Sequence, residues 1–175
     1  MKTIKLLSLS KARRNLVKFA LFLSVITPAT IPTAHASETA YAATSTTGLK
    51  VGDNHAGGII AYIYRKNDHG YVAGETHGLI AGKNDLGEGS TWDQAVALCK
   101  AYRAGGFSDW RLPSKEELNK LYINKAAIGG LKELHFYWSS TASDKNDAWD
   151  QSFRTGNRNL GYKLDNNFVR AVRVF

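Results

Sequence analysis

The chain has 175 residues, of which 43% are hydrophobic, with one cysteine and a formal net charge of +8. This length accommodates one domain with a tail, and a single cysteine excludes a disulfide framework. Residues 1–36 hold six basic and no acidic residues, whereas residues 37–175 hold 17 basic and 15 acidic residues. The body is therefore nearly neutral, which excludes a protein-wide field that would attract nucleic acid.

Residues 1–36 have the order of a secretory signal peptide: a basic head, the short apolar run Phe19–Thr27 and the small-x-small site Ala34–Ala36. The apolar run is shorter than the roughly 20 residues that span a bilayer, so we expect no transmembrane anchor after cleavage. The pair Arg13-Arg14 resembles a twin-arginine export motif, while an ordinary secretory signal remains the alternative. Both predict export to the periplasm, the cell surface or the medium.

Residues 37–49 are small and polar and predict a flexible tail, so the folded domain is expected over residues 50–175. The β-branched and aromatic residues of Gly57–Tyr64 predict a strand, and a turn over Asn67–Gly70 predicts a return strand that begins at Tyr71. Gly78–Ala81 is a further short apolar run.

Two helices are expected in the middle of the chain. Residues 91–103 place five residues on one helical face: Trp92, Ala95, Val96, Cys99 and Tyr102. This position indicates that Cys99 is a buried small hydrophobe. Ser114–Glu117 has the pattern of a capping box and predicts a second helix that begins there.

The last forty residues alternate between short strands and turns. Strands are predicted over Tyr137–Thr141, Ala148–Phe153, Leu160–Leu164 and Phe168–Phe175, with a turn at residues 155–158. Two helices among many short strands predict an α+β domain with a mainly antiparallel sheet.

Six ordered motifs in the body carry a resemblance to a known family. They are Val51–Asp53 with Gly57–Ile60, His77–Leu79, Trp92-x-x-Ala95 with Cys99, Asp109–Leu118, Tyr137–Thr141 and Val169–Arg173. In this order they resemble the Lcl C-terminal domain family over residues 50–175. The Trp-Arg-Leu-Pro element and the terminal Val-Arg strand are also similar to formylglycine-generating enzymes and C-type-lectin-like folds.

The resemblance implies a C-type-lectin-like domain on an exported bacterial protein. In the collagen-like adhesin after which the family is named, the domain binds sulfated glycans and forms a trimer. This chain has no Gly-X-Y run, so whether it forms a homo-oligomer stays open. The resemblance to formylglycine-generating enzymes carries no mechanism here, because those enzymes use a cysteine pair and Cys99 is alone.

Aromatic and basic residues of the motifs have a structural interpretation. Trp110, Trp138 and Trp149 are large enough to organise a small core. Arg111, Arg170 and Arg173 lie among apolar residues, so we expect them to pair with acids such as Asp109, Glu117 or Asp150. The alternative is that these arginines form an exposed anion site.

No metal, cofactor or catalytic site is expected. None of the histidines has metal-ligand spacing, and neither a nucleophile elbow nor a phosphate loop is present. Asp144, Asn146, Asp147 and Asp150 could offer oxygen ligands to calcium, but an Asp/Asn-rich turn explains them more simply. We therefore expect a protein that is not an enzyme; the alternative is a glycosidase whose paired carboxylates are distant along the chain.

A binding role remains, and four residues are its candidate site: Trp149, Arg154, Arg158 and Lys163. Adjacent strands around the turn at residues 155–158 would bring cations together beside an indole face, which suits sulfated or carboxylated sugars. The sequence thus predicts a secreted, non-catalytic domain that recognises acidic glycans at a cell surface. The alternative is a structural subunit of a bacterial envelope assembly, whose partner is another envelope protein.

Overall fold

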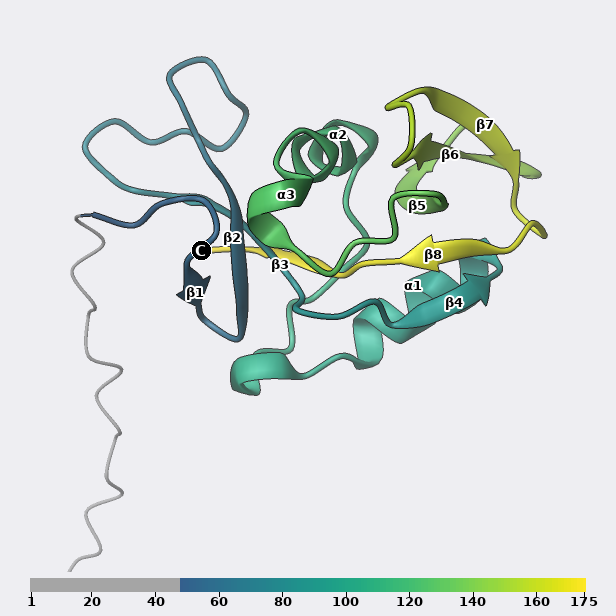
Figure 1. Ribbon diagram of the computed structural model, residues 1–175, viewed down its shortest axis with the longest axis horizontal. Coiled ribbons are helices and arrows are strands. Elements are labelled where there is room, and N and C mark those ends of the chain that lie inside the picture. Colours follow the sequence, from purple (N-terminus) through teal and green to yellow (C-terminus); the bar gives the residue numbers. More distant parts are fainter. Residues whose placement is uncertain (1–47) are drawn as a thin grey trace, which may run out of the picture. The chain divides into compact units, whose positions relative to one another are not determined.

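A computed structural model describes residues 48–175, and these residues form two β-sheets and three α-helices (Figure 1). The first sheet is antiparallel, in the order β1 (Asn54–His55), β2 (Gly58–Ile63), β3 (Gly78–Ala81) and β9 (Val172–Val174). The second has the order β4 (Gly87–Ser90), β8 (Asn167–Val169), β5 (Phe136–Ala142), β6 (Asp147–Ser152) and β7 (Arg158–Tyr162). All of its neighbours are antiparallel except β5 and β8. The predicted α+β class with mainly antiparallel strands is confirmed.

The helices lie on both sides of the strands. In Figure 1, α2 (Lys115–Ile123) and the short α3 (Lys125–Ile128) lie above β8 and β9, and α1 (Trp92–Ala101) lies below them. A 3₁₀ turn, Ala104–Gly106, follows α1. No helix within residues 48–175 has the length and apolar character needed to cross a membrane. The predicted signal peptide, residues 1–36, and most of the predicted tail lie outside the described residues.

The first predicted helix is confirmed, with Thr91 as its N-cap. The Thr91 N–H donates to the Gln94 side chain at 3.0 Å, which satisfies one amide of the first turn. Ala95 and Cys99 are fully buried on the inward face. Burial raises the pKa of the Cys99 thiol to about 12, so the thiol stays protonated and behaves as the small hydrophobe that its position predicts.

Two strand predictions are wrong in part. Tyr71 lies in an irregular loop, and the strand that pairs with β2 is β3, so the connection runs from Tyr64 to His77. The segment Phe168–Phe175 is not one strand, because it divides at Arg170–Ala171 into β8 and β9, which belong to different sheets. The final segment therefore joins the two sheets.

The core has two clusters. One lies around α2, α3 and the first sheet, and it includes Leu118, Leu121, Tyr137 and Phe153. The other lies between α1 and the strands and includes Cys99, Trp110 and Trp138. Trp110 and Trp138 are buried as expected, whereas Trp149 is only partly buried on β6. An indole that the core does not fully cover is available for another contact.

Candidate functional site

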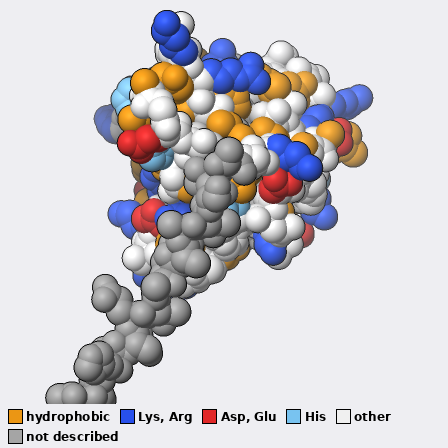
Figure 2. Space-filling model, turned by 90° about the vertical axis from the view of Figure 1, so that its left-hand side faces the viewer, with side chains coloured by type: hydrophobic (Ala, Val, Ile, Leu, Met, Phe, Trp, Pro, Cys, Tyr) orange, Lys and Arg blue, Asp and Glu red, His pale blue; other side chains and the backbone are white. Residues whose placement is uncertain are grey.

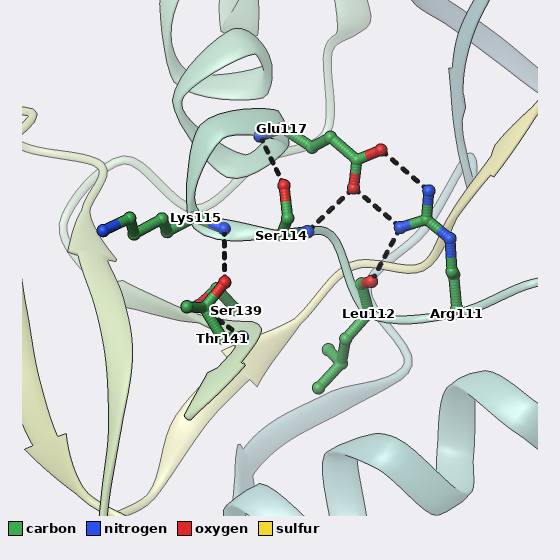
Figure 3. Close-up of polar contacts among 7 residues, drawn as sticks. All are labelled: Arg111, Leu112, Ser114, Lys115, Glu117, Ser139 and Thr141. Carbon is green, nitrogen blue, oxygen red and sulfur yellow. Dashed lines mark hydrogen bonds and ion pairs between the residues drawn. The ribbon is translucent and has the colours of Figure 1, made fainter. Parts of the chain in front are cut away.

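The motif segment Asp109–Leu118 fixes the beginning of α2 (Figure 3). The Arg111 guanidinium donates to both carboxylate oxygens of Glu117 at 2.6 and 2.7 Å. Ser114 completes the predicted capping box: its N–H donates to Glu117 Oε2 at 2.8 Å, and its Oγ accepts from the Glu117 N–H at 3.2 Å. Burial raises the pKa of Glu117, but the hydrogen bonds from Arg111 and Ser114 outweigh burial and leave the pKa lowered. Glu117 therefore stays charged, and the first turn is held in place.

This capping arrangement also positions Lys115. The Lys115 N–H donates to Thr141 Oγ1 on β5 at 3.0 Å, and its side chain extends away from the Arg111–Glu117 pair (Figure 3). The Lys115 ammonium lies 4.6 Å from the centroid of the Trp149 ring, within the range of a cation–π contact. The motif thus places a cation beside the partly exposed indole of β6.

The hairpin of β6 and β7 supplies the rest of this surface. The strands are antiparallel with Trp149 opposite Leu160 and Gln151 opposite Arg158, so these four side chains share one face of the sheet. Leu160 is 52% exposed and Tyr162, two residues further along the same face, is 48% exposed. We call Lys115, Trp149, Arg154, Arg158 and Leu160 the hairpin surface.

The turn of this hairpin is packed against α2. Gly156 has φ +82°, and a Cβ at this position would lie 2.5 Å from the Tyr122 ring, so only glycine permits this approach. Gln151 on β6 donates to the Asn119 side chain at 2.8 Å and to the Gly156 carbonyl at 3.0 Å. The position of the arginines that flank the turn is therefore defined by the fold.

The arginines of the described body divide into two groups. Five have partners: Arg65 lies over the Tyr62 ring, Arg103 donates to two carbonyls, and Arg111, Arg170 and Arg173 pair with Glu117, Asp85 and Asp109. The prediction that Arg111, Arg170 and Arg173 pair with acids is confirmed, although the acid beside Arg170 is Asp85, which the sequence did not indicate. Within residues 48–175, the guanidinium groups of Arg154 and Arg158 have neither an ion pair nor a hydrogen bond. These two cations are free to meet an external anion.

The four residues predicted as a site do not all meet. Trp149 and Arg158 share a face, and Arg154 lies in the turn of the same hairpin. Lys163 is an odd number of residues from Arg158, so its side chain is on the opposite face of the hairpin. Its ammonium lies 4.6 Å from the Trp92 ring centroid and donates to the Asp144 carbonyl at 2.8 Å. The cation that meets the Trp149 indole is therefore Lys115, which sequence reasoning missed because it is distant along the chain.

The Asp/Asn-rich loop has a structural explanation. Asp144 Oδ1 accepts the N–H groups of Asn146 and Asp147 at 2.7 and 2.8 Å, as in an Asx turn, and these bonds lower its pKa. Asp150 is buried and accepts from Asn167 at 2.9 Å, and burial raises its pKa. Across residues 48–175, no three His, Cys, Asp or Glu side chains are arranged to hold a metal ion. The four residues do not form one ligand set.

A polar cleft of about 360 Å³ lies between the β2–β3 connection and α2. Its charged groups are already paired: Asp68 accepts from Lys120 at 2.8 Å and from the Tyr62 hydroxyl at 2.9 Å, and Glu117 is held by Arg111. Burial raises the pKa of Asp68, but the bonds from Lys120, the Arg65 N–H and Tyr62 outweigh burial and lower the pKa to about 2. This cleft offers less uncompensated charge than the hairpin surface.

Two comparisons with known proteins bear on the identity of the chain. No curated protein matched it. The family model described as the Lcl C-terminal domain matches residues 66–173, which include the capping segment, the β6–β7 hairpin and the terminal Val-Arg strand. Because the match covers more than half of its length, the protein belongs to the Lcl C-terminal domain family.

Proposed function

We propose that this protein is an exported, non-catalytic binding domain that recognises acidic or sulfated glycans through the hairpin surface. The observation that carries the proposal is the pair of unpartnered arginines on one hairpin, beside a partly exposed indole that already contacts a lysine. By contrast, Arg111, Arg170 and Arg173 are neutralised by acids of the same domain.

The chemistry of these groups matches a charged sugar. Guanidinium groups form paired hydrogen bonds with planar carboxylates and bind sulfate oxygens. The apolar surface of Trp149, Leu160 and Tyr162 can pack against the C–H face of a sugar ring, which is a weakly apolar surface. Lys115 takes the place that the sequence assigned to Lys163, because its ammonium lies beside the indole.

Binding through this surface would be local rather than protein-wide. Figure 2 views the end of the molecule at which β1 lies, and there basic and acidic side chains are interspersed with hydrophobic ones. Residues 37–175 hold 17 basic and 15 acidic residues, so we expect the attraction to come from the local cations of the hairpin surface rather than from the net charge. We expect affinity to fall with salt, because the Debye length shrinks from about 10 Å at 0.1 M to about 3 Å at 1 M.

The double variant Arg154→Ala/Arg158→Ala is expected to bind heparin at least about tenfold more weakly than the wild type. Hydrogen bonds to charged groups contribute about 1.5–3 kcal/mol each, and about 1.4 kcal/mol corresponds to tenfold in affinity. The midpoint of thermal unfolding should change little, because both side chains are exposed and lack internal partners. Calorimetric titration at two salt concentrations measures the binding.

The matched control is Arg65→Ala/Lys66→Ala, which removes the same charge from exposed positions in the β2–β3 connection. This control should bind heparin nearly as well as the wild type. Equal losses in both double variants would show that only net charge matters. Normal binding by Arg154→Ala/Arg158→Ala would show that the surface is wrongly assigned.

The second candidate function is a structural subunit of an envelope assembly that binds another envelope protein. It is favoured by large hydrophobic side chains that are exposed on the described domain, of which Leu134, Leu164 and Ile123 are the most accessible. A wild-type domain that binds no acidic glycan even at low salt would make this the better proposal.

Export is part of the proposal, and it rests on the sequence of residues 1–36. We expect the mature chain to begin at Ser37, after Ala34–Ala36, or at Ala43, after the second small-x-small pattern Ala40–Ala42, and to be found outside the cytoplasm. Mass spectrometry of the N-terminal peptide checks this, and recovery of Met1 from extracellular protein would contradict cleavage. Export that is unchanged in Arg13→Lys/Arg14→Lys would exclude the twin-arginine route.

A further inference from the structure

Among the strands of residues 48–175, β7 is at the edge of the five-stranded sheet and has β6 as its one neighbour. The hydrogen bonds at the two ends of the β6–β7 pair show which residues of β7 direct their main-chain groups toward β6. The Ser152 N–H donates to the Asn157 carbonyl at 2.9 Å, and the Lys163 N–H donates to the Asn146 carbonyl at 2.8 Å. Because hydrogen-bonded and non-hydrogen-bonded pairs alternate in antiparallel strands, the main-chain groups of residues 159 and 161 point toward β6. Those of residues 158, 160 and 162 point away from the sheet.

One of these three outward positions is already satisfied. The Tyr162 N–H donates to the Asp165 side chain at 3.0 Å, and the Tyr162 carbonyl accepts the Asp165 N–H at 2.7 Å. Within the described chain, this leaves the N–H and C=O groups of Arg158 and Leu160 facing solvent on the open edge. Such groups are a template for pairing with another strand.

We propose that two copies of this protein pair through β7, antiparallel and about a two-fold axis that passes through Asn159. In this register Arg158 of each copy is opposite Leu160 of the second copy, and all the free main-chain groups of both edges are used. Placing Leu160 opposite itself would set Arg158 against Tyr162, whose groups Asp165 occupies. Placing Arg158 opposite itself would set Leu160 against Gly156, which lies in the turn beyond the strand.

Charge and closure favour the same register. Each Arg158 faces a leucine rather than the other arginine, so like charges are not directly opposed. A two-fold pairing of one edge with itself closes and cannot grow further. The opposite edge, β4, is four residues long and has a register irregularity against β8, which makes it a poor template. A dimer, rather than a fibre, is the expected assembly.

The dimer would also enlarge the proposed binding site, a consequence that rests on the proposed function. Both Arg158 side chains would lie on the same face of one continuous sheet, in diagonal positions about 7–8 Å apart. Two hairpin surfaces would then meet in one strip, which suits a glycan with repeated acidic groups more than one with a single charge.

Disulfide cross-linking tests the register directly. In the proposed dimer, Asn159 of the two copies form a non-hydrogen-bonded pair with Cα atoms about 4.5 Å apart, within the range that a disulfide spans. We expect Asn159→Cys to give a covalent dimer within minutes in a mild redox buffer at micromolar concentration. Cys99 is buried and does not compete.

The matched control is Leu160→Cys, because Leu160 of the two copies would be diagonal neighbours about 7–8 Å apart, too distant for a relaxed disulfide. It should cross-link at least about tenfold more slowly than Asn159→Cys. Equal rates, or no cross-linking by Asn159→Cys, would overturn the proposed register.

Sedimentation equilibrium tests whether the outward main-chain groups of β7 are needed for dimer formation. Leu160→Pro removes an outward N–H without disturbing the pairing with β6, so it should be monomeric at concentrations where the wild type self-associates. Leu160→Val keeps the N–H and should remain dimeric. A monomeric wild type at several hundred micromolar would overturn the proposal. Neither assay contains glycan, so a failure of the proposed function would leave both results unchanged.

Discussion

Replacing Asp85 with alanine is expected to lower the free energy of unfolding by about 3–5 kcal/mol, because it leaves a buried arginine without its counter-charge. The Arg170 side chain is fully buried and that of Asp85 is 7% exposed, and the two are joined at 2.7 Å. The remaining Arg170 donors bond to the carbonyls of Gly82, Lys83 and Gly130, none of which carries a negative charge.

Asp85 also accepts from the Tyr137 hydroxyl at 2.8 Å. The Asp85 carboxylate therefore binds two parts of the fold. One is Arg170, which lies between β8 and β9, and the other is Tyr137, a core residue of β5. Loss of the carboxylate would weaken the link between the two sheets as well as leave the guanidinium uncompensated. Urea unfolding followed by tryptophan fluorescence measures the change.

Asp109→Ala is the matched control for Asp85→Ala. It removes the carboxylate that pairs with Arg173 at 2.8 Å, but the Asp109 side chain is 56% exposed. The Arg173 side chain is only 9% exposed, but water reaches the pair from the Asp109 side, so this variant should lose clearly less stability than Asp85→Ala. Similar losses in the two variants would contradict the argument that burial determines the cost.

Replacing Trp138 with alanine is the second substitution with a large expected effect, a loss of about 3–5 kcal/mol of stability. Its indole is fully buried beneath α1, and the indole N–H donates to the Ser90 carbonyl at 2.8 Å. The ring lies so close to Gly161 that a Cβ there would be 3.0 Å away. Alanine would leave a cavity directly beneath β7.

Trp138→Phe separates packing from hydrogen bonding. It keeps an aromatic ring but removes the donor to Ser90, so we expect a smaller loss, about 1–3 kcal/mol. Chemical unfolding of both variants checks the order of the losses. A phenylalanine variant as unstable as the alanine variant would show that the hydrogen bond, rather than the volume of the ring, determines stability at this position.

The helices could be predicted because their determinants are local. The Ser114–Glu117 capping box and the spacing of Ala95 and Cys99 act within a few residues, and the structure shows both. The division of the last segment could not be predicted, since Phe168–Phe175 has a continuous β pattern. It divides because the buried Arg170 guanidinium forms hydrogen bonds with residues that are distant along the chain, including Asp85 and Gly130.

Part of the candidate site could be predicted from the sequence. Strand alternation places Arg158, Leu160 and Tyr162 on one face, and the same parity already assigns Lys163 to the other face. The role of Lys115 could not be predicted, because its contact with Trp149 depends on how α2 packs across the sheet. The strand β4, Gly87–Ser90, was missed because its glycine-rich sequence has little strand propensity, and it extends only by pairing with β8.

The first strand and the C-terminus of the described chain lie together, far from the β6–β7 hairpin. The C-terminal Phe175 packs its ring 4.9 Å from that of His55 in β1, whereas β7 lies at the opposite end of the described domain (Figure 1). A domain held by the segment that precedes residue 48 would therefore present the hairpin surface outward. Immobilisation on a sensor or bead through that segment leaves the β6–β7 hairpin accessible, while coupling through Lys115 would block it.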